Sequence, residues 1–256
     1  MRLSANLGFL FQDLPLADRI RAAHRWGFDC VELHWPYADD PAAAADALAE
    51  TGLSLISVNT ARGDVAAGDF GLSALPDRRH DARAAIAQAI DWAARAGARN
   101  VHVMAGKAQG QAAHDTYVDN LRFAAQLAAP HGIGILIEPL NPRDAPGYYL
   151  ADLPSALRTA TDAGGDVKVM FDCYHMQIVH GDLLERVRAA LPQIGHIQFA
   201  AVPDRAEPDH GEVDYARLLP EIVGLGYRGA FGAEYRPASG SFDWMPRLRQ
   251  CLSAAT

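Results

Sequence analysis

Apolar residues along this chain follow two alternating patterns. Short apolar runs, many of them rich in β-branched residues, predict strands at residues 3–9, 29–35, 53–59, 100–106, 133–139, 167–173, 195–201 and 230–236. Between the runs lie Ala-rich segments whose apolar residues recur every three or four positions, which predicts helices at residues 16–27, 41–52, 78–97, 114–132 and 153–165. Strands that alternate with helices in this way are typical of a parallel sheet.

Eight such units predict one α/β domain over residues 1–256, a closed (β/α)8 TIM barrel. A doubly wound open sheet is the alternative, but no GxGxxG sequence follows the first run. Barrel enzymes keep their chemistry at the C-terminal ends of the strands, and two long connections follow strand ends, at residues 60–77 and 202–213. The sequence leaves open whether residues 60–77 form a lid.

Charge, cysteine spacing and apolar content restrict the possible binding partners and the cellular location of the protein. The chain carries 23 basic and 31 acidic residues, a net charge of −8, and no cluster of Lys or Arg, so nucleic acid is an unfavourable partner. The cysteines Cys30, Cys173 and Cys251 are far apart and form no CxxC spacing, which indicates reduced thiols. We find no signal-peptide pattern and no long apolar run, so we expect a soluble, cytoplasmic protein without a membrane segment.

Polar residues stand at the ends of the last four strand runs: Glu138, Asp172, Gln198 and Glu234. One such residue is commonly a salt-bridged or solvated group, but four on consecutive strands point into the same mouth. Three carboxylates gathered there repel one another unless a positive charge compensates them. Oxygen donors of this kind predict one divalent cation, Mg²⁺ or Mn²⁺.

Four further polar residues are candidates for substrate contact. His175 follows Asp172 by three positions, at the expected start of a helix, where it can hydrogen-bond a substrate oxygen. Arg205 follows the seventh strand and is suited to bidentate pairing with a substrate carboxylate, with Glu207 either orienting it or lying on the surface. Lys107, just past the fourth strand, is a second candidate for anion contact.

Several sequence segments together resemble the hydroxypyruvate isomerase family of the xylose isomerase-like TIM barrel superfamily. They are RLSANLGFLF, GFDCVELHWPY, RGDVAAGDFGLSALPDRR, ILIEPLN, FDCYHMQ, GHIQFAAVPDRAEPDHGEVDY and GAEYRP. The resemblance implies that Glu138 and Glu234 bind the cation and also act as acid and base. It implies substrate contacts for His175 and Arg205. At the position of Gln198 the related ketose 3-epimerases carry His, so Gln favours the hydroxypyruvate isomerase branch.

The resemblance implies a metal-dependent aldose–ketose isomerase of carbohydrate metabolism. Its reaction would interconvert hydroxypyruvate and 2-hydroxy-3-oxopropanoate (tartronate semialdehyde) through an enediolate. A 2-oxo-tetronate isomerase or a ketose 3-epimerase, acting on a four-carbon 2-oxo acid or a short sugar, is the alternative within the superfamily. A zinc-dependent apurinic endonuclease and a non-catalytic sugar-binding barrel are more distant alternatives. His34, Trp35 and Val65 depart from the family pattern and leave the substrate size open. The sequence also leaves open whether the chain forms a homo-oligomer.

Overall fold

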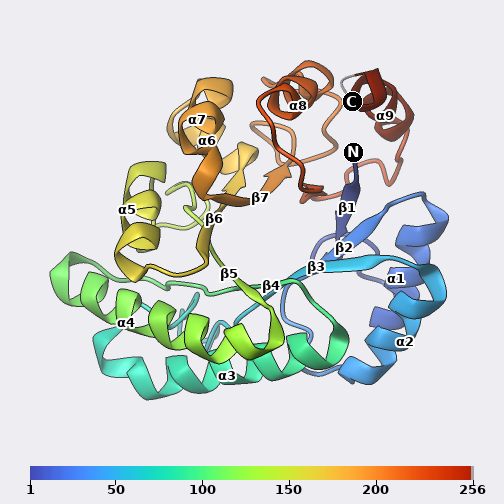
Figure 1. The fold of residues 1–256 in the computed structure, drawn as a ribbon. Coiled ribbons are helices and arrows are strands. Elements are labelled where there is room, and N and C mark those ends of the chain that lie inside the picture. Colours follow the sequence, from blue (N-terminus) through green and yellow to red (C-terminus); the bar gives the residue numbers. More distant parts are fainter. Residues whose placement is uncertain (255–256) are drawn as a thin grey trace.

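The eight strands close into one parallel barrel in chain order, in a computed structural model that describes residues 1–254 (Figure 1). Each strand pairs with its neighbours in the sequence, and the last pairs with the first. The strands are β1 (Leu3–Asn6), β2 (Cys30–Leu33), β3 (Ser54–Asn59), β4 (Asn100–His102), β5 (Gly134–Ile137), β6 (Val167–Asp172), β7 (Ile194–Phe199) and β8 (Phe231–Ala233). The predicted TIM barrel is confirmed.

Helices surround the barrel as an outer ring (Figure 1). They are α1 (Leu16–Arg25), α2 (Pro41–Thr51), α3 (Arg79–Ala96), α4 (Gly110–Ala128), α5 (Leu153–Ala163), α6 (Cys173–Val179), α7 (Leu183–Ala190), α8 (Tyr215–Gly224) and α9 (Trp244–Ala254). All five predicted helices are present, although α4 begins at Gly110 rather than at residue 114. Within the described residues, no helix combines the length and apolar character that a membrane span needs.

Local chemistry fixes the ends of α2. The Asp40 side chain accepts the backbone N–H of Ala42 at 3.0 Å, and Pro41 occupies the first helical position, where its missing N–H costs nothing. The helix ends at Gly52, whose φ of 71° lies in the left-handed region that glycine adopts without a steric penalty. These signals let the sequence predict both ends of the helix closely.

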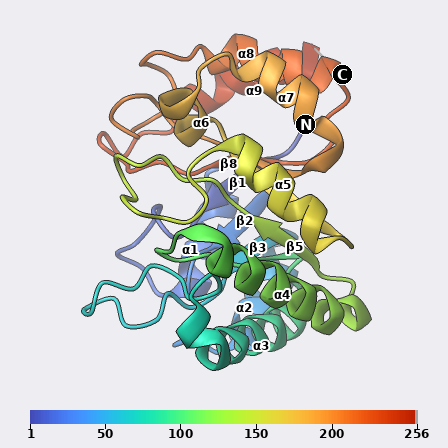
Figure 2. The ribbon, with the colours of Figure 1, turned by 90° about the vertical axis from the view of Figure 1, so that its left-hand side faces the viewer.

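All of the predicted strands except that at residues 53–59 run past the hydrogen-bonded ladder at their C-terminal ends. Residues 230–236 were expected to be extended, yet β8 stops at Ala233, and β5 stops at Ile137. Glu234 and Glu138 therefore come directly after their ladders and line the rim of the barrel. The long connections project on one side of the barrel (Figure 2), which is the side of these strand ends.

Candidate metal and active site

Strand register brings the four predicted oxygen ligands to one end of the barrel. Asp172 is the last residue of β6 and lies opposite Gln198 of β7, which in turn lies opposite Gly232 of β8. Glu234 stands two residues beyond Gly232, so its side chain points to the same face. Glu138, Asp172, Gln198 and Glu234 are 5%, 0%, 2% and 6% exposed. Three acids and an amide are thus buried at one end of a barrel.

Contacts within the protein satisfy some polar atoms of these side chains and leave other oxygens unpaired. Asp172 Oδ1 accepts the backbone N–H of Tyr174 at 2.8 Å, and Glu234 Oε1 lies 3.1 Å from His34 Nε2. Glu138 Oε1, Gln198 Oε1 and Glu234 Oε2 are buried without a hydrogen-bond partner. Buried oxygens without partners are costly, and a divalent cation with oxygen ligands would satisfy them. The donor set therefore fits Mg²⁺ or Mn²⁺.

The acidic groups also carry a shared electrostatic penalty. Burial, followed by repulsion from Glu234 and Asp172, holds the pKa of Glu138 well above its usual range. Burial raises the pKa of Asp172 to about 7, although the neighbouring Arg205 acts in the opposite direction. One guanidinium does not offset the burial of three carboxylates, so the site favours a second positive charge.

The raised pKa of Asp172 predicts how the stability of the cation-free protein depends on pH. Because its carboxyl favours protonation in the fold, the stabilisation is present below its ordinary pKa of 3.8 and is lost as the pH rises through about 7. As the pH rises from 3.8 to about 7, we expect the free energy of unfolding to fall more in the wild-type protein than in Asp172→Asn, which lacks the titrating group. Urea unfolding in EDTA at about pH 5 and pH 8 measures this difference. Equal pH dependence in the two proteins would contradict the prediction.

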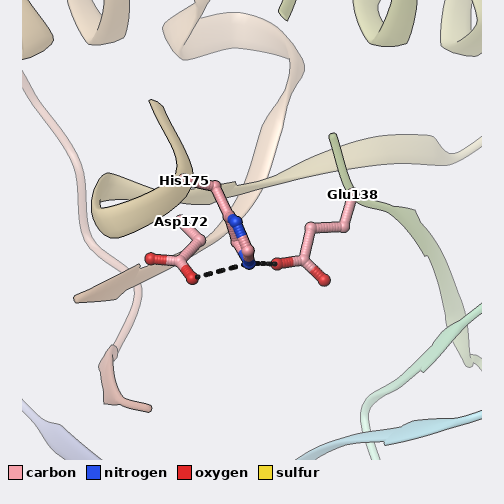
Figure 3. A group of neighbouring side chains, drawn as sticks. All are labelled: Glu138, Asp172 and His175. Atoms are coloured by element: carbon pink, nitrogen blue, oxygen red, sulfur yellow. Dashed lines mark ion pairs between the residues drawn. The ribbon is translucent and has the colours of Figure 1, made fainter. Parts of the chain in front are cut away.

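His175 lies between two of the carboxylates, as Figure 3 shows. Its Nε2 is 3.6 Å from Asp172 Oδ2 and 3.9 Å from Glu138 Oε1, and a metal ion could be held by this group of three. However, its Nδ1 accepts the backbone N–H of Asn141 at 3.1 Å, with the Asn141 side-chain nitrogen at 2.7 Å. Burial and Arg205 keep the His175 pKa well below its usual range, so the ring is neutral. The hydrogen then sits on Nε2, which makes His175 a donor toward the site and leaves ligation to the oxygens.

Arg205 is buried in the site and already serves as an internal counter-charge. Its Nη2 lies 3.4 Å from Asp172 Oδ2 and 3.3 Å from Glu234 Oε1. The guanidinium packs over the rings of Phe9 and Tyr174, at 5.1 and 4.9 Å from their centroids. The Arg205 backbone has a φ of 57°, a left-handed conformation that costs a non-glycine residue roughly 1–2 kcal/mol. The surrounding contacts hold a strained residue at this point, as is common at functional sites.

A cavity of about 320 Å³ opens above these groups. Besides Glu138, Glu234, His175 and Arg205, it is lined by residues that the sequence prediction did not assign to the site: His102, Asn59, Met104, Phe70, Arg62 and Arg236. His34 and Trp35, considered only as departures from the family pattern, also line it. Several of these residues could have been found by the rule that predicted the ligands, because Asn59 and His102 end their strands and His34 directly follows β2.

Arg62 differs from Arg205 in having no acidic partner. Its guanidinium carbon lies 3.6 Å from the centroid of the Trp35 ring, and burial lowers its pKa. No carboxylate of residues 1–254 forms an ion pair with it. Stacking on the indole fixes its position without neutralising it. Arg62 thus offers the cavity a cation available to an anionic ligand.

The remaining two predicted residues lie outside this cavity. Lys107 is exposed, and its Nζ donates to the Gly68 carbonyl at 3.0 Å, tying down the 60–77 connection. Glu207 is buried and accepts the backbone N–H groups of Ala238 and Ser239 at 3.0 and 2.9 Å. Neither lines the cavity, and Glu207 also accepts a hydrogen bond from the Ser239 hydroxyl at 2.9 Å.

Comparison with known proteins extends over almost the whole chain. A family model described as xylose isomerase-like TIM barrel matches residues 20–252. The 2-oxo-tetronate isomerase of Cupriavidus necator is 42% identical over 256 residues, covering 98% of each chain. The hydroxypyruvate isomerase of Escherichia coli is 35% identical over 257 residues, covering 97% of this chain and 100% of that protein. A crystal structure of a Brucella melitensis protein named AP endonuclease, family 2, superposes with a TM-score of 0.92 at 35% identity, over 96% and 98% of the two chains.

Proposed function

The chain belongs to the xylose isomerase-like TIM barrel family, and from that premise we propose that it is an aldose–ketose isomerase of a short 2-oxo acid, with hydroxypyruvate as the substrate. The observation that carries the proposal is the pair of buried glutamates, Glu138 and Glu234, which line one cavity together with a neutral His175. Such a pair can move a proton between adjacent carbons. The product would be 2-hydroxy-3-oxopropanoate.

Glu138, Asp172, Gln198 and Glu234 would hold one Mg²⁺ or Mn²⁺, on the strength of their unpartnered oxygens. When bound, the cation would stabilise negative charge that develops on the substrate oxygens. It would also lower the energetic cost of keeping Glu138 ionised, since burial and neighbouring acids otherwise hold the pKa of that group high. An ionised glutamate is the form that can accept a proton.

The residues of the chain account for each proton in the reaction. One glutamate removes a hydrogen from the carbon that bears the hydroxyl, which leaves an enediolate. The other glutamate, which begins the cycle protonated, gives its proton to the neighbouring carbon, and the hydroxyl proton passes to the former carbonyl oxygen. Transfer of the abstracted proton from the first glutamate to the second then restores the starting state. His175, which presents an Nε2–H, donates a hydrogen bond to a substrate oxygen, and Arg205 stabilises the anionic side of the site.

A four-carbon substrate is the second candidate, because the Cupriavidus necator relative named 2-oxo-tetronate isomerase shares 42% identity. The experiment is a kcat/KM panel of hydroxypyruvate, a 2-oxo-tetronate and a neutral ketohexose with Mg²⁺ present, run in D₂O. The highest kcat/KM on hydroxypyruvate supports the proposal, and the highest on the tetronate supports the second candidate. Turnover of the ketose alone contradicts both, and no deuterium incorporation into any of them would indicate a non-catalytic binding protein.

An endonuclease activity, after the name of the Brucella melitensis protein, is less well supported. The proposed ligand set contains the amide of Gln198, and the net charge of −8 provides little attraction for a phosphate backbone. We therefore propose the isomerase, and the same preparation incubated with abasic duplex DNA tests the alternative.

Arg62 is expected to bind the substrate carboxylate. We predict that Arg62→Ala raises KM for the 2-oxo acid by about tenfold or more with kcat nearly unchanged, since hydrogen bonds to a charged group contribute about 1.5–3 kcal/mol. Arg205→Ala should lower kcat as well, because Arg205 contacts Asp172 and Glu234. Steady-state kinetics of both variants, with Arg62→Lys as the matched control, separate the two roles. An unchanged KM in Arg62→Ala would assign the carboxylate to Arg205 or Arg236.

A further inference from the structure

A fourth buried acid lies inside the barrel, next to the proposed ligand Gln198. Glu32, on β2, is 1% exposed, and its Oε2 accepts a hydrogen bond from Gln198 Nε2 at 2.7 Å. His196, two residues before Gln198 on β7, places its Nε2 3.1 Å from the same oxygen. The interior of a TIM barrel is commonly filled by branched apolar side chains, so an acid here calls for an explanation.

Gly232 of β8 leaves the space that the acid occupies. A Cβ atom at this position would lie 2.3 Å from Glu32 Oε1 and 2.9 Å from both Gln198 Cγ and His196 Nε2. No alanine fits there without displacing the carboxylate. The backbone of β8 is therefore matched to Glu32 and its two neighbours on β7.

The contact between Glu32 and Gln198 determines which end of the amide faces the ligand cluster. A carboxylate accepts hydrogen bonds, so the amide nitrogen must face Glu32. Rotating the amide by half a turn would put two oxygens at the 2.7 Å separation that now joins nitrogen to oxygen. With the nitrogen held, Gln198 Oε1 is the atom left without a partner, and it is buried.

We propose that Glu32 is a positioning residue that orients the Gln198 amide so that oxygen, and not nitrogen, faces the cation. The inference rests on the proposed cation site, to which it adds an orienting contact. An amide nitrogen is a donor with no lone pair to offer a hard cation, so the wrong orientation removes a ligand and brings positive hydrogens toward the metal. Groups that orient a ligand in this way typically affect metal affinity by 10–100-fold.

The first test measures Mn²⁺ binding to the metal-free protein by isothermal titration calorimetry. Glu32→Gln lets residue 198 adopt either orientation, and we expect Mn²⁺ to bind about 10–100-fold more weakly. The exchanged variant Glu32→Gln/Gln198→Glu keeps the hydrogen bond and the total charge, but its new carboxylate presents an oxygen in either orientation. We expect it to bind Mn²⁺ at least as tightly as the wild-type protein.

Two outcomes overturn the inference. The first is wild-type affinity in a folded Glu32→Gln protein, and the second is an exchanged variant that binds as weakly as the single variant, because the orientation of residue 198 would then not explain the loss of affinity. Failure of the wild-type protein to bind Mn²⁺ at all is a separate result, which contradicts the proposed cation site. Thermal unfolding of each variant reports whether it folds.

A measurement on the wild-type protein serves if Glu32→Gln does not fold. With glutamine side chains labelled with ¹⁵N, the Nε2 hydrogens of Gln198 should exchange slowly with solvent both without and with Mg²⁺, because Glu32 holds them in both states. Slow exchange in both states supports the inference. Loss of protection when Mg²⁺ is added would mean that the nitrogen leaves Glu32, which overturns it.

Discussion

Glu138→Gln and Glu234→Gln are each expected to lower kcat by about 10²–10⁴-fold, the range that general acid–base groups contribute, while KM changes only a few-fold. Glutamine keeps the shape of the side chain and an oxygen that can face the cation, but it cannot accept a proton from carbon. Both side chains line the cavity, and each keeps one buried oxygen without a hydrogen-bond partner, although the other oxygen of Glu234 pairs with His34 and Arg205.

The assay separates this chemistry from a loss of folding or of metal. Steady-state kinetics give kcat, calorimetry gives the Mn²⁺ affinity of each variant, and deuterium exchange into the substrate reports the proton abstraction alone. Glu185→Gln is the control, because Glu185 lies on the exposed face of α7, where it pairs with Arg188, and its loss should leave all three measurements unchanged. Activity that survives in both Glu138→Gln and Glu234→Gln would contradict the assignment of these residues as acid and base.

The barrel could be predicted because the sequence signals for its strands and helices are local. Apolar runs and glycine-terminated helices each depend on residues within a few positions, and residues 41–52 show this well, since Asp40 and Gly52 mark both ends of α2. The strand ends were harder to predict, because nothing in the sequence shows where a ladder loses its partner. Residues 230–236 were predicted as one strand, yet only three of them, Phe231–Ala233, are in β8.

The four proposed ligands could be located for a related reason. Strand ends of a parallel barrel meet at one mouth, so polar residues at the ends of neighbouring strands converge whatever the loops do. Asp172 and Gln198 lie directly opposite each other in the register, as this argument requires. It extends equally to His102 and Asn59, which the sequence prediction did not use.

Contacts between distant residues could not be predicted. Glu32 and Gln198 are separated by 166 positions and meet only because the barrel closes. The state of His175 depends on Asn141, which lies 34 residues away on another loop. Lys107 illustrates the converse, since it follows β4 closely but turns outward to the Gly68 carbonyl. Orientation of side chains around a site is thus set by tertiary contacts that a single sequence does not display.

Removal of the divalent cation is expected to abolish activity, by about 10²-fold or more, because a Lewis acid in such a site contributes several kcal/mol to charge stabilisation. Dialysis against EDTA followed by removal of the chelator should leave a folded, inactive protein, and Mg²⁺ or Mn²⁺ should restore turnover. The oxygen donor set of Glu138, Asp172, Gln198 and Glu234 predicts that these ions are more effective than Zn²⁺, which prefers His or Cys.

Proton release accompanies this rebinding. Since burial raises the pKa of Asp172 to about 7 and holds that of Glu138 well above its usual range, protonation of both groups competes with cation binding in the metal-free protein. Cation binding requires their ionised forms, so binding should expel protons and weaken as the pH falls below about 7. Calorimetry in buffers of different ionisation enthalpy measures the protons released, and Asp172→Asn should both weaken binding and reduce that number. Full activity in the presence of EDTA, with no metal detected in the protein, would contradict the cation site, because Arg205 would then be the main positive charge facing these carboxylates.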